Sequence, residues 1–212
     1  PKNGRAPWES AAKGPMVLPG VYSVTLSQRV EGQYQDIAGP QQLQLKPLFS
    51  GGLVTENRSE LLEFQQKTAD MYRAVMGAGR AAGEIDGRID HMIKAVSDTP
   101  GSSEAHASAL RGLKARMQDL KVRLDGDSTV SSRAEPVPLA LSGRVSTIAY
   151  GTWNSQSGLA GNFTDSYDVA AAQLPAVLAE LKAVESELAA LEAELEAEGA
   201  PWTPSRIPDW QP

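Results

Sequence analysis

Apolar and polar residues alternate near the N-terminus of the chain. Tyr22, Val24 and Leu26 fall on one face of an extended segment, and the residues between them are polar. Residues 33–37 and 42–46 alternate in the same way. The turn signals Glu31-Gly32 and Gly39-Pro40 separate these segments. We therefore expect a three-stranded antiparallel β-meander over residues 1–50, with one apolar face that requires a partner.

From residue 55 onward the apolar residues instead recur at intervals of seven, each followed by another three residues later. This heptad pattern is typical of long amphipathic helices packed into a bundle. In the last helix the repeating positions are leucines, with Gly199 as the predicted C-terminal cap. We predict a bundle over residues 51–199, with helices near 55–97, 103–124, 138–153 and 166–198, followed by a Pro- and Trp-rich tail over 200–212. The fold class is α+β, mainly α.

The net charge of −6 lies in one predicted helix. Of 212 residues, 26 are acidic and 20 basic, but residues 174–198 alone hold seven glutamates against Lys182. The remainder of the chain is neutral. An acidic chain is a poor candidate for binding nucleic acid or an anionic membrane surface.

Charges of opposite sign flank the apolar positions of two predicted helices. The last helix carries acidic flanks and the second helix carries basic ones, and such flanks select neighbours in helix bundles. We predict that these two helices pack side by side in a bundle with three helices in cross-section, in which the second and third helices follow one another along the first. A square four-helix bundle would keep them apart. The residues expected to pair are Lys114, Arg116, Lys121 and Arg123 with Glu180, Glu185, Glu187, Glu192 and Glu194.

The sequence offers little catalytic chemistry. It has no cysteine, which excludes disulfides, thiolate metal sites and cysteine nucleophiles. Its two histidines, His91 and His106, stand on different helices without a metal-binding motif. Residues 125–136 begin like a calcium loop but end in Pro136 instead of a glutamate. We predict no catalytic residue, no cofactor, no metal site and no membrane span.

The segment Gly14-Pro15-Met16-Val17-Leu18-Pro19-Gly20-Val21-Tyr22-Ser23-Val24-Thr25-Leu26 resembles the Pro-Gly-x-Tyr-x-Val-x-Leu strand of a small immunoglobulin-like module. That module occurs near the C-terminus of bacterial sortilin-like propeller proteins with BNR (Asp-box) repeats, often labelled glycosyl hydrolases. There it precedes a long-helix bundle and a Pro-rich end. The resemblance implies a partial immunoglobulin-like sandwich, export to the periplasm or cell exterior, and propeller domains upstream as partners.

These observations lead to one expectation and two alternatives. We expect a fragment of a longer chain that serves as a non-catalytic C-terminal interaction or stabilising module of an exported propeller protein, with another protein as a further possible partner. The first alternative is a coiled-coil structural protein whose leucine seams join two chains. The second is an accessory part of a glycoside hydrolase whose active site lies upstream.

Overall fold

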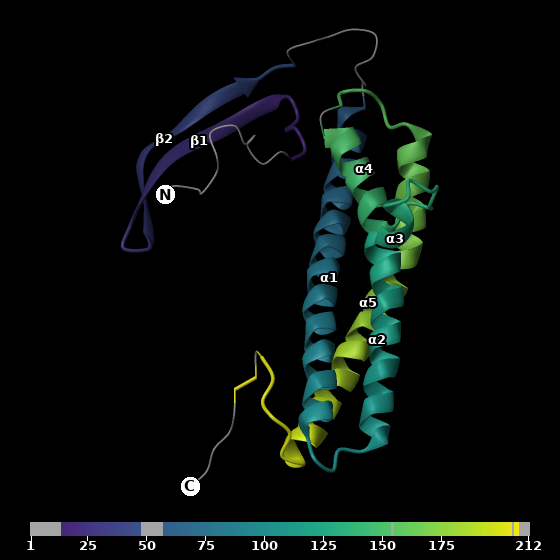
Figure 1. Cartoon of the computed structure of the whole chain (residues 1–212). Coiled ribbons are helices and arrows are strands. Elements are labelled where there is room, and N and C mark those ends of the chain that lie inside the picture. The colour runs from purple at the N-terminus through teal and green to yellow at the C-terminus, as the bar shows by residue number, and fades with distance from the viewer. Residues whose placement is uncertain (1–13, 48–56, 154, 205, 208–212) are drawn as a thin grey trace. The chain divides into compact units, whose positions relative to one another are not determined.

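The computed structural model describes residues 14–47, 57–153, 155–204 and 206–207. The described residues up to 67, with those of 150–160, form one compact unit, and the described residues of 68–149, with those after 160, form another. The fold is α+β and mainly α: a two-stranded sheet precedes the helices in the chain (Figure 1).

The first unit contains an antiparallel hairpin of β1 (Gly20–Val30) and β2 (Gln33–Leu45). Glu31 and Gly32, which join the strands, both have positive φ, as a two-residue hairpin turn requires. The prediction of three strands is wrong, because β2 runs through Gly39-Pro40 instead of turning there. This dipeptide forms an irregularity opposite Thr25, and a Cβ on Gly39 would lie 2.7 Å from the Val24 carbonyl oxygen.

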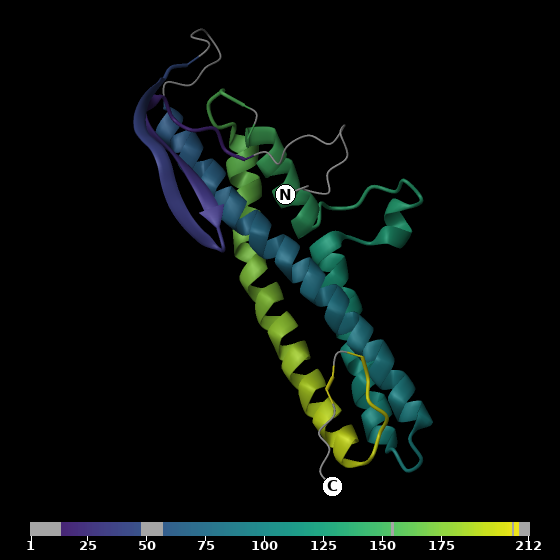
Figure 2. The same cartoon turned by 90° about the vertical axis from the view of Figure 1, so that its left-hand side faces the viewer.

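The helices are α1 (Arg58–Asp98), α2 (Glu104–Asp125), the short α3 (Ser128–Ser131), α4 (Leu141–Trp153) and α5 (Gly161–Ala197). In the second unit α2 runs opposite to α1 and α5, and α4 continues in the direction of α2 (Figures 1 and 2). Ser103 caps α2 by accepting a hydrogen bond from the His106 amide, and Gly126 ends it with a φ of 90°. α5 continues through Pro175.

The heptad positions of the sequence form the buried core. Every apolar position predicted from the repeat in α1, from Leu61 to Val96, is buried, as are Leu110, Leu113, Met117, Leu120 and Leu124 of α2. Leu174, Leu181, Leu188 and Leu195 of α5 are buried in the same cluster. The leucines of α5 are therefore buried against the other helices of the same chain. None of the described helices is long and apolar enough to cross a membrane.

Candidate functional site

The charged residues beside the buried seam form the most extensive polar feature of the helical unit. In each heptad the seam residues occupy positions a and d, and positions e and g flank them. Leu113 and Leu120 are d positions of α2, so Lys114 and Lys121 form its e flank. Arg116 and Arg123 form its g flank. These two flanks lie on opposite sides of the seam and have different partners.

The g flank of α2 pairs with the g flank of α5. Arg116 Nη1 lies 2.7 Å from Glu187 Oε2, and its Nε lies 3.8 Å from Glu180 Oε1. Arg123 forms an ion pair with Glu180 and a second with Asp119 of its own helix, at 3.1 Å. The hydrogen bond from Arg116 to Glu187 raises the pKa of the guanidinium. These contacts place α2 beside α5, antiparallel to it.

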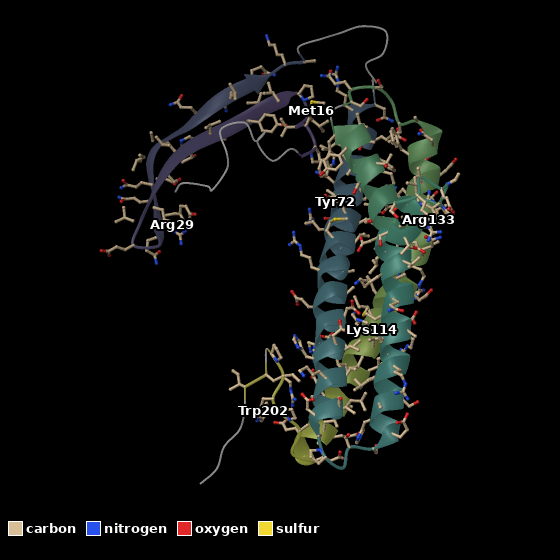
Figure 3. All side chains as sticks on the ribbon, in the orientation of Figure 1. Met16, Arg29, Tyr72, Lys114, Arg133 and Trp202 are labelled. Atoms are coloured by element: carbon tan, nitrogen blue, oxygen red, sulfur yellow. The ribbon has the colours of Figure 1, made fainter. Side chains whose placement is uncertain are left out.

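The e flank of α2 faces α1 instead of α5. Lys114 Nζ lies 2.7 Å from Asp86 Oδ1 and 2.6 Å from Asp90 Oδ1, and Lys121 Nζ lies 2.8 Å from Asp86 Oδ2 (Figure 3 labels Lys114). The expectation that these two lysines pair with the acidic helix is wrong. With three helices in cross-section, the two flanks of each helix face different neighbours, so only one flank of α2 reaches α5.

Asp86 is the centre of this second contact. Burial raises the pKa of its carboxyl group, but hydrogen bonds from Lys114 and Lys121 outweigh burial and leave the pKa below its usual value. For Lys114, burial lowers the pKa of the ammonium group, and hydrogen bonds to Asp86 and Asp90 more than compensate. Both partners are therefore held in their charged forms.

The e flank of α5 faces α1. Arg88 donates two hydrogen bonds to Glu192, from Nε to Oε1 at 3.1 Å and from Nη2 to Oε2 at 2.6 Å. The Glu192 side chain is 7% exposed, so this is the most buried ion pair among the described residues. The hydrogen bond from Arg88 to Glu192 is the main cause that raises the pKa of Arg88, and the charge of Glu185 adds to it. Neither glutamate meets a basic residue of α2, contrary to the expectation.

Glu194 and His106 meet where α2 begins and α5 ends. Glu194 Oε2 lies 3.5 Å from His106 Nε2, and Glu198 Oε2 lies 3.5 Å from His106 Nδ1. Ser103 Oγ lies 3.1 Å from the same Nδ1 atom. Glu194 thus faces α2 as predicted from its position, but its partner is a histidine that the charge pattern did not include. His91 lies exposed on α1.

The pairings follow the geometry expected of three helices. Antiparallel neighbours bring like-lettered flanks together, and parallel neighbours bring g to e. The e–e contacts join α1 to α2, the g–g contacts join α2 to α5, and Arg88 at g meets Glu192 at e between the parallel α1 and α5. Sequence reasoning missed Asp86, Asp90 and Arg88. The flanks of α1 would have revealed Asp86 and Arg88, had they been compared with those of the other two helices.

The tail contributes one further contact to this charged surface. Arg206 forms an ion pair with Glu196, donates to the Glu192 carbonyl oxygen at 3.3 Å, and lies 4.9 Å from the ring centre of Trp202. The tail therefore contacts α5 through Arg206. Trp210 lies outside the described residues.

In this unit the charged groups serve to hold the helices together. The flank carboxylates Asp86, Glu180, Glu187 and Glu192 each pair with a cation of another helix. The described part of the chain has no group of His, Asp and Glu arranged to hold a metal ion. Asp127, in the segment that resembles a calcium loop, accepts hydrogen bonds from Thr129 and Val130 and caps α3. These hydrogen bonds lower the pKa of Asp127, and the bond from the Thr129 side chain has the largest effect.

The hairpin offers a surface of a different kind. The pairing places Tyr22 opposite Leu43 and Leu26 opposite Ala38, so these side chains share a face with Val24. Val24, Leu26 and Leu43 are each more than 50% exposed. A sheet of two strands with an apolar face in water is marginally stable. This face is the part of the described chain that most resembles an incomplete interface.

Comparisons with protein-family models, with curated proteins and with solved structures give no match to this chain.

Proposed function

We propose that the chain is a non-catalytic interaction and stabilising module at the C-terminal end of a larger exported protein of the sortilin-like propeller type. The observation that carries the proposal is the exposed apolar face of the hairpin, centred on Val24, Leu26 and Leu43. In this proposal, the apolar face is covered by the remaining strands of an immunoglobulin-like sandwich, which lie in the region that precedes this chain. The resemblance of residues 14–26 to the Pro-Gly-x-Tyr-x-Val-x-Leu strand of such a module supports that choice.

The helical unit would act as a rigid extension in this proposal. Its apolar seam is buried, and its flanks are paired between helices, so the unit is self-contained. The hairpin is then the natural contact to the rest of the protein, because main-chain edges and an apolar face together allow further strands to be added.

The test begins with the reading frame that encodes this chain, in which repeated Asp-box motifs should precede residue 1. The upstream region, produced as a separate polypeptide, should bind this chain in isothermal titration calorimetry. Val24→Asp should weaken that binding at least about tenfold, because it places a charge on the apolar face. Ser23→Asp, one residue away on the polar face, should leave binding unchanged. A frame without Asp-box motifs, or equal effects of the two substitutions, would refute the proposal.

We propose no enzymatic activity for the chain alone. Incubation with a panel of aryl glycosides should give no hydrolysis above a buffer control. Turnover by the purified chain would overturn this and would favour the glycoside hydrolase alternative.

Self-association is a second candidate, favoured by the outer face of α5. Small residues recur there at alternating intervals of four and three, all exposed: Ala172, Ala176, Ala179, Ala183, Ser186, Ala190, Ala193 and Ala197. Such spacing would let two helices approach closely. Light scattering coupled to size exclusion decides between the candidates, because a monomer of 22.6 kDa excludes this one. If a dimer forms, Ala183→Glu should dissociate it without unfolding the helices.

A further inference from the structure

The unit that contains the hairpin has an open hollow of about 620 Å³. Most of its lining is aliphatic: Met16, Val17 and Leu18 precede β1, Leu45 ends β2, and Leu61 and Leu62 lie in the first turns of α1. Figure 3 labels Met16. A concave, mainly apolar site of this volume is typical of sites that bind small molecules.

Hydrogen bonds hold the walls of the hollow. The Tyr22 hydroxyl donates to the Leu18 carbonyl oxygen at 2.6 Å, which fixes the segment before β1 against its own strand. Gly20 pairs with Leu45, so the same strand fixes the end of β2. On the helical side, the buried Gln65 donates to the Thr152 carbonyl oxygen at 2.7 Å. Each wall is therefore ordered by contacts within the unit.

The charged groups of the lining are all cationic. Lys46 and Arg58 line the hollow, and among the described residues no aspartate or glutamate does. Among the described residues neither cation takes part in an ion pair, whereas most other cations of α1 and α2 do. An apolar hollow with two cations that have no ion-pair partner in the described part of the chain fits a ligand that joins an alkyl chain to a negative head group.

We propose that this hollow binds a single-chain anionic amphiphile, a free fatty carboxylate, with its alkyl chain among Met16, Leu45 and Leu61 and its carboxylate near Lys46 and Arg58. Val24, Leu26 and Leu43, the centre of the apolar face of the hairpin, are not among the residues that line the hollow. Binding of a fatty carboxylate can therefore be tested separately from the proposed docking function.

The direct test is isothermal titration calorimetry with dodecanoate, below the concentration at which it forms micelles. Saturable binding of one dodecanoate per chain is expected. Decanoate, shorter by two methylenes, should bind about tenfold more weakly, because each buried methylene contributes about fourfold to affinity. Dodecan-1-ol has the same chain without the charge and should bind at least about tenfold more weakly than dodecanoate.

Variants separate the head-group contact from the chain contact. The double substitution Lys46→Gln with Arg58→Gln should weaken dodecanoate binding about tenfold or more and leave dodecan-1-ol binding unchanged. Arg80→Gln is the matched control, since Arg80 lies exposed on the same helix outside the hollow. Met16→Ser should weaken both ligands to a similar extent. Circular dichroism verifies that each variant keeps its helices.

Three results would overturn the proposal. They are the absence of saturable dodecanoate binding, equal affinity for dodecan-1-ol, and a double variant that binds dodecanoate like the parent chain. Co-sedimentation with phosphatidylglycerol vesicles distinguishes a free fatty carboxylate from a lipid in a membrane surface as the ligand. The chain should stay in the supernatant, and sedimentation with vesicles in the absence of dodecanoate binding would point to a membrane surface instead.

Discussion

At the scale of single residues, two buried threonines differ in the hydrogen bonds of their hydroxyl groups: Thr68 lies within α1 and Thr99 directly follows it. Thr68 is fully buried at a seam position, and its hydroxyl has no hydrogen-bond partner among the described residues. Thr99 is also buried, but its hydroxyl donates to the Ala95 carbonyl oxygen at 2.7 Å. A buried hydroxyl without a partner lowers stability by about 1–3 kcal/mol.

We expect Thr68→Val to raise the free energy of unfolding by about 1 kcal/mol, because valine has the same shape and no group to desolvate. Thr99→Val is the matched control and should lower that free energy, since it removes a hydrogen bond. Urea denaturation followed by circular dichroism measures both. Destabilisation by Thr68→Val would mean that its hydroxyl has a partner, such as a buried water.

A second residue-scale prediction concerns the buried pair of Arg88 and Glu192. Glu192→Gln leaves a partly buried guanidinium opposite a neutral side chain and should lower the free energy of unfolding by about 2–3 kcal/mol. Glu185→Gln, one heptad earlier on the same flank and exposed, should change it by less than about 0.5 kcal/mol. Denaturant titration measures both. Equal effects would mean that burial does not strengthen the Arg88 contact.

At the scale of elements, the heptad pattern predicted the helices and their buried seams well, because burial of an apolar stripe dominates helix packing. The charges that flank the seams predicted correctly that α2 lies beside α5. The partners of Lys114 and Lys121 were missed, since only two helices were compared and α1 was left out. The strands were harder. Alternation fixes which face of a strand is apolar, but Gly39-Pro40 fits an irregularity within a strand as well as a turn between two.

The contact of α2 with α1 predicts a pH dependence. The pKa of Asp86 is lowered in the folded state, so its stabilisation is present above the unfolded pKa of about 3.9 and is lost as pH falls through the folded value. At pH 7, Asp86→Asn should lower the free energy of unfolding by about 1–2 kcal/mol, and this difference should shrink below pH 4. Asp70→Asn, at a 70% exposed side chain, should show little difference at either pH. Denaturation at pH 7 and pH 3 tests this.

The glycines of α1 give a further prediction at this scale. A Cβ added at Gly77, Gly83 or Gly87 would meet nothing within 4 Å among the described residues, so these positions do not serve close helix contact there. Gly83→Ala should raise the free energy of unfolding by about 1 kcal/mol, because alanine favours helix. Gly101→Ala is the contrasting control: with a φ of 92° it should destabilise. Thermal unfolding measures both, and destabilisation by Gly83→Ala would reveal a contact at that position.

At the scale of the whole molecule, the two units differ in what stabilises them. The core cluster of the second unit draws on α1, α2, α4 and α5 and contains no residue of the hairpin. The hairpin is stabilised by strand pairing and has few buried side chains. Composition and periodicity predicted the fold class at this scale. They could not predict the partner of the hairpin, because an exposed apolar face indicates an apolar contact without specifying which surface makes it.

A chain that begins at Asn57 should therefore keep its helices. We expect cooperative thermal unfolding with a midpoint within about 5 °C of that of the whole chain, because the seam and its flanking ion pairs remain. Circular dichroism at 222 nm measures it. Loss of cooperative unfolding would mean that residues before Asn57 contribute to the helical core.

The e flank of α1 bears a single acidic residue, Asp86, since its other positions are Arg58, Gln65, Tyr72, Gly79 and Ile93. An insertion of seven residues between Asp86 and the end of α1 would keep the apolar stripe facing inward. It would also carry Asp86 about 10 Å along the axis, away from both lysines. Burial of the apolar stripe therefore tolerates a change of one heptad in helix length, but the ion pairs of Asp86 do not. The ion pairs of Asp86 with Lys114 and Lys121 thus fix the number of residues between Asp86 and the end of α1.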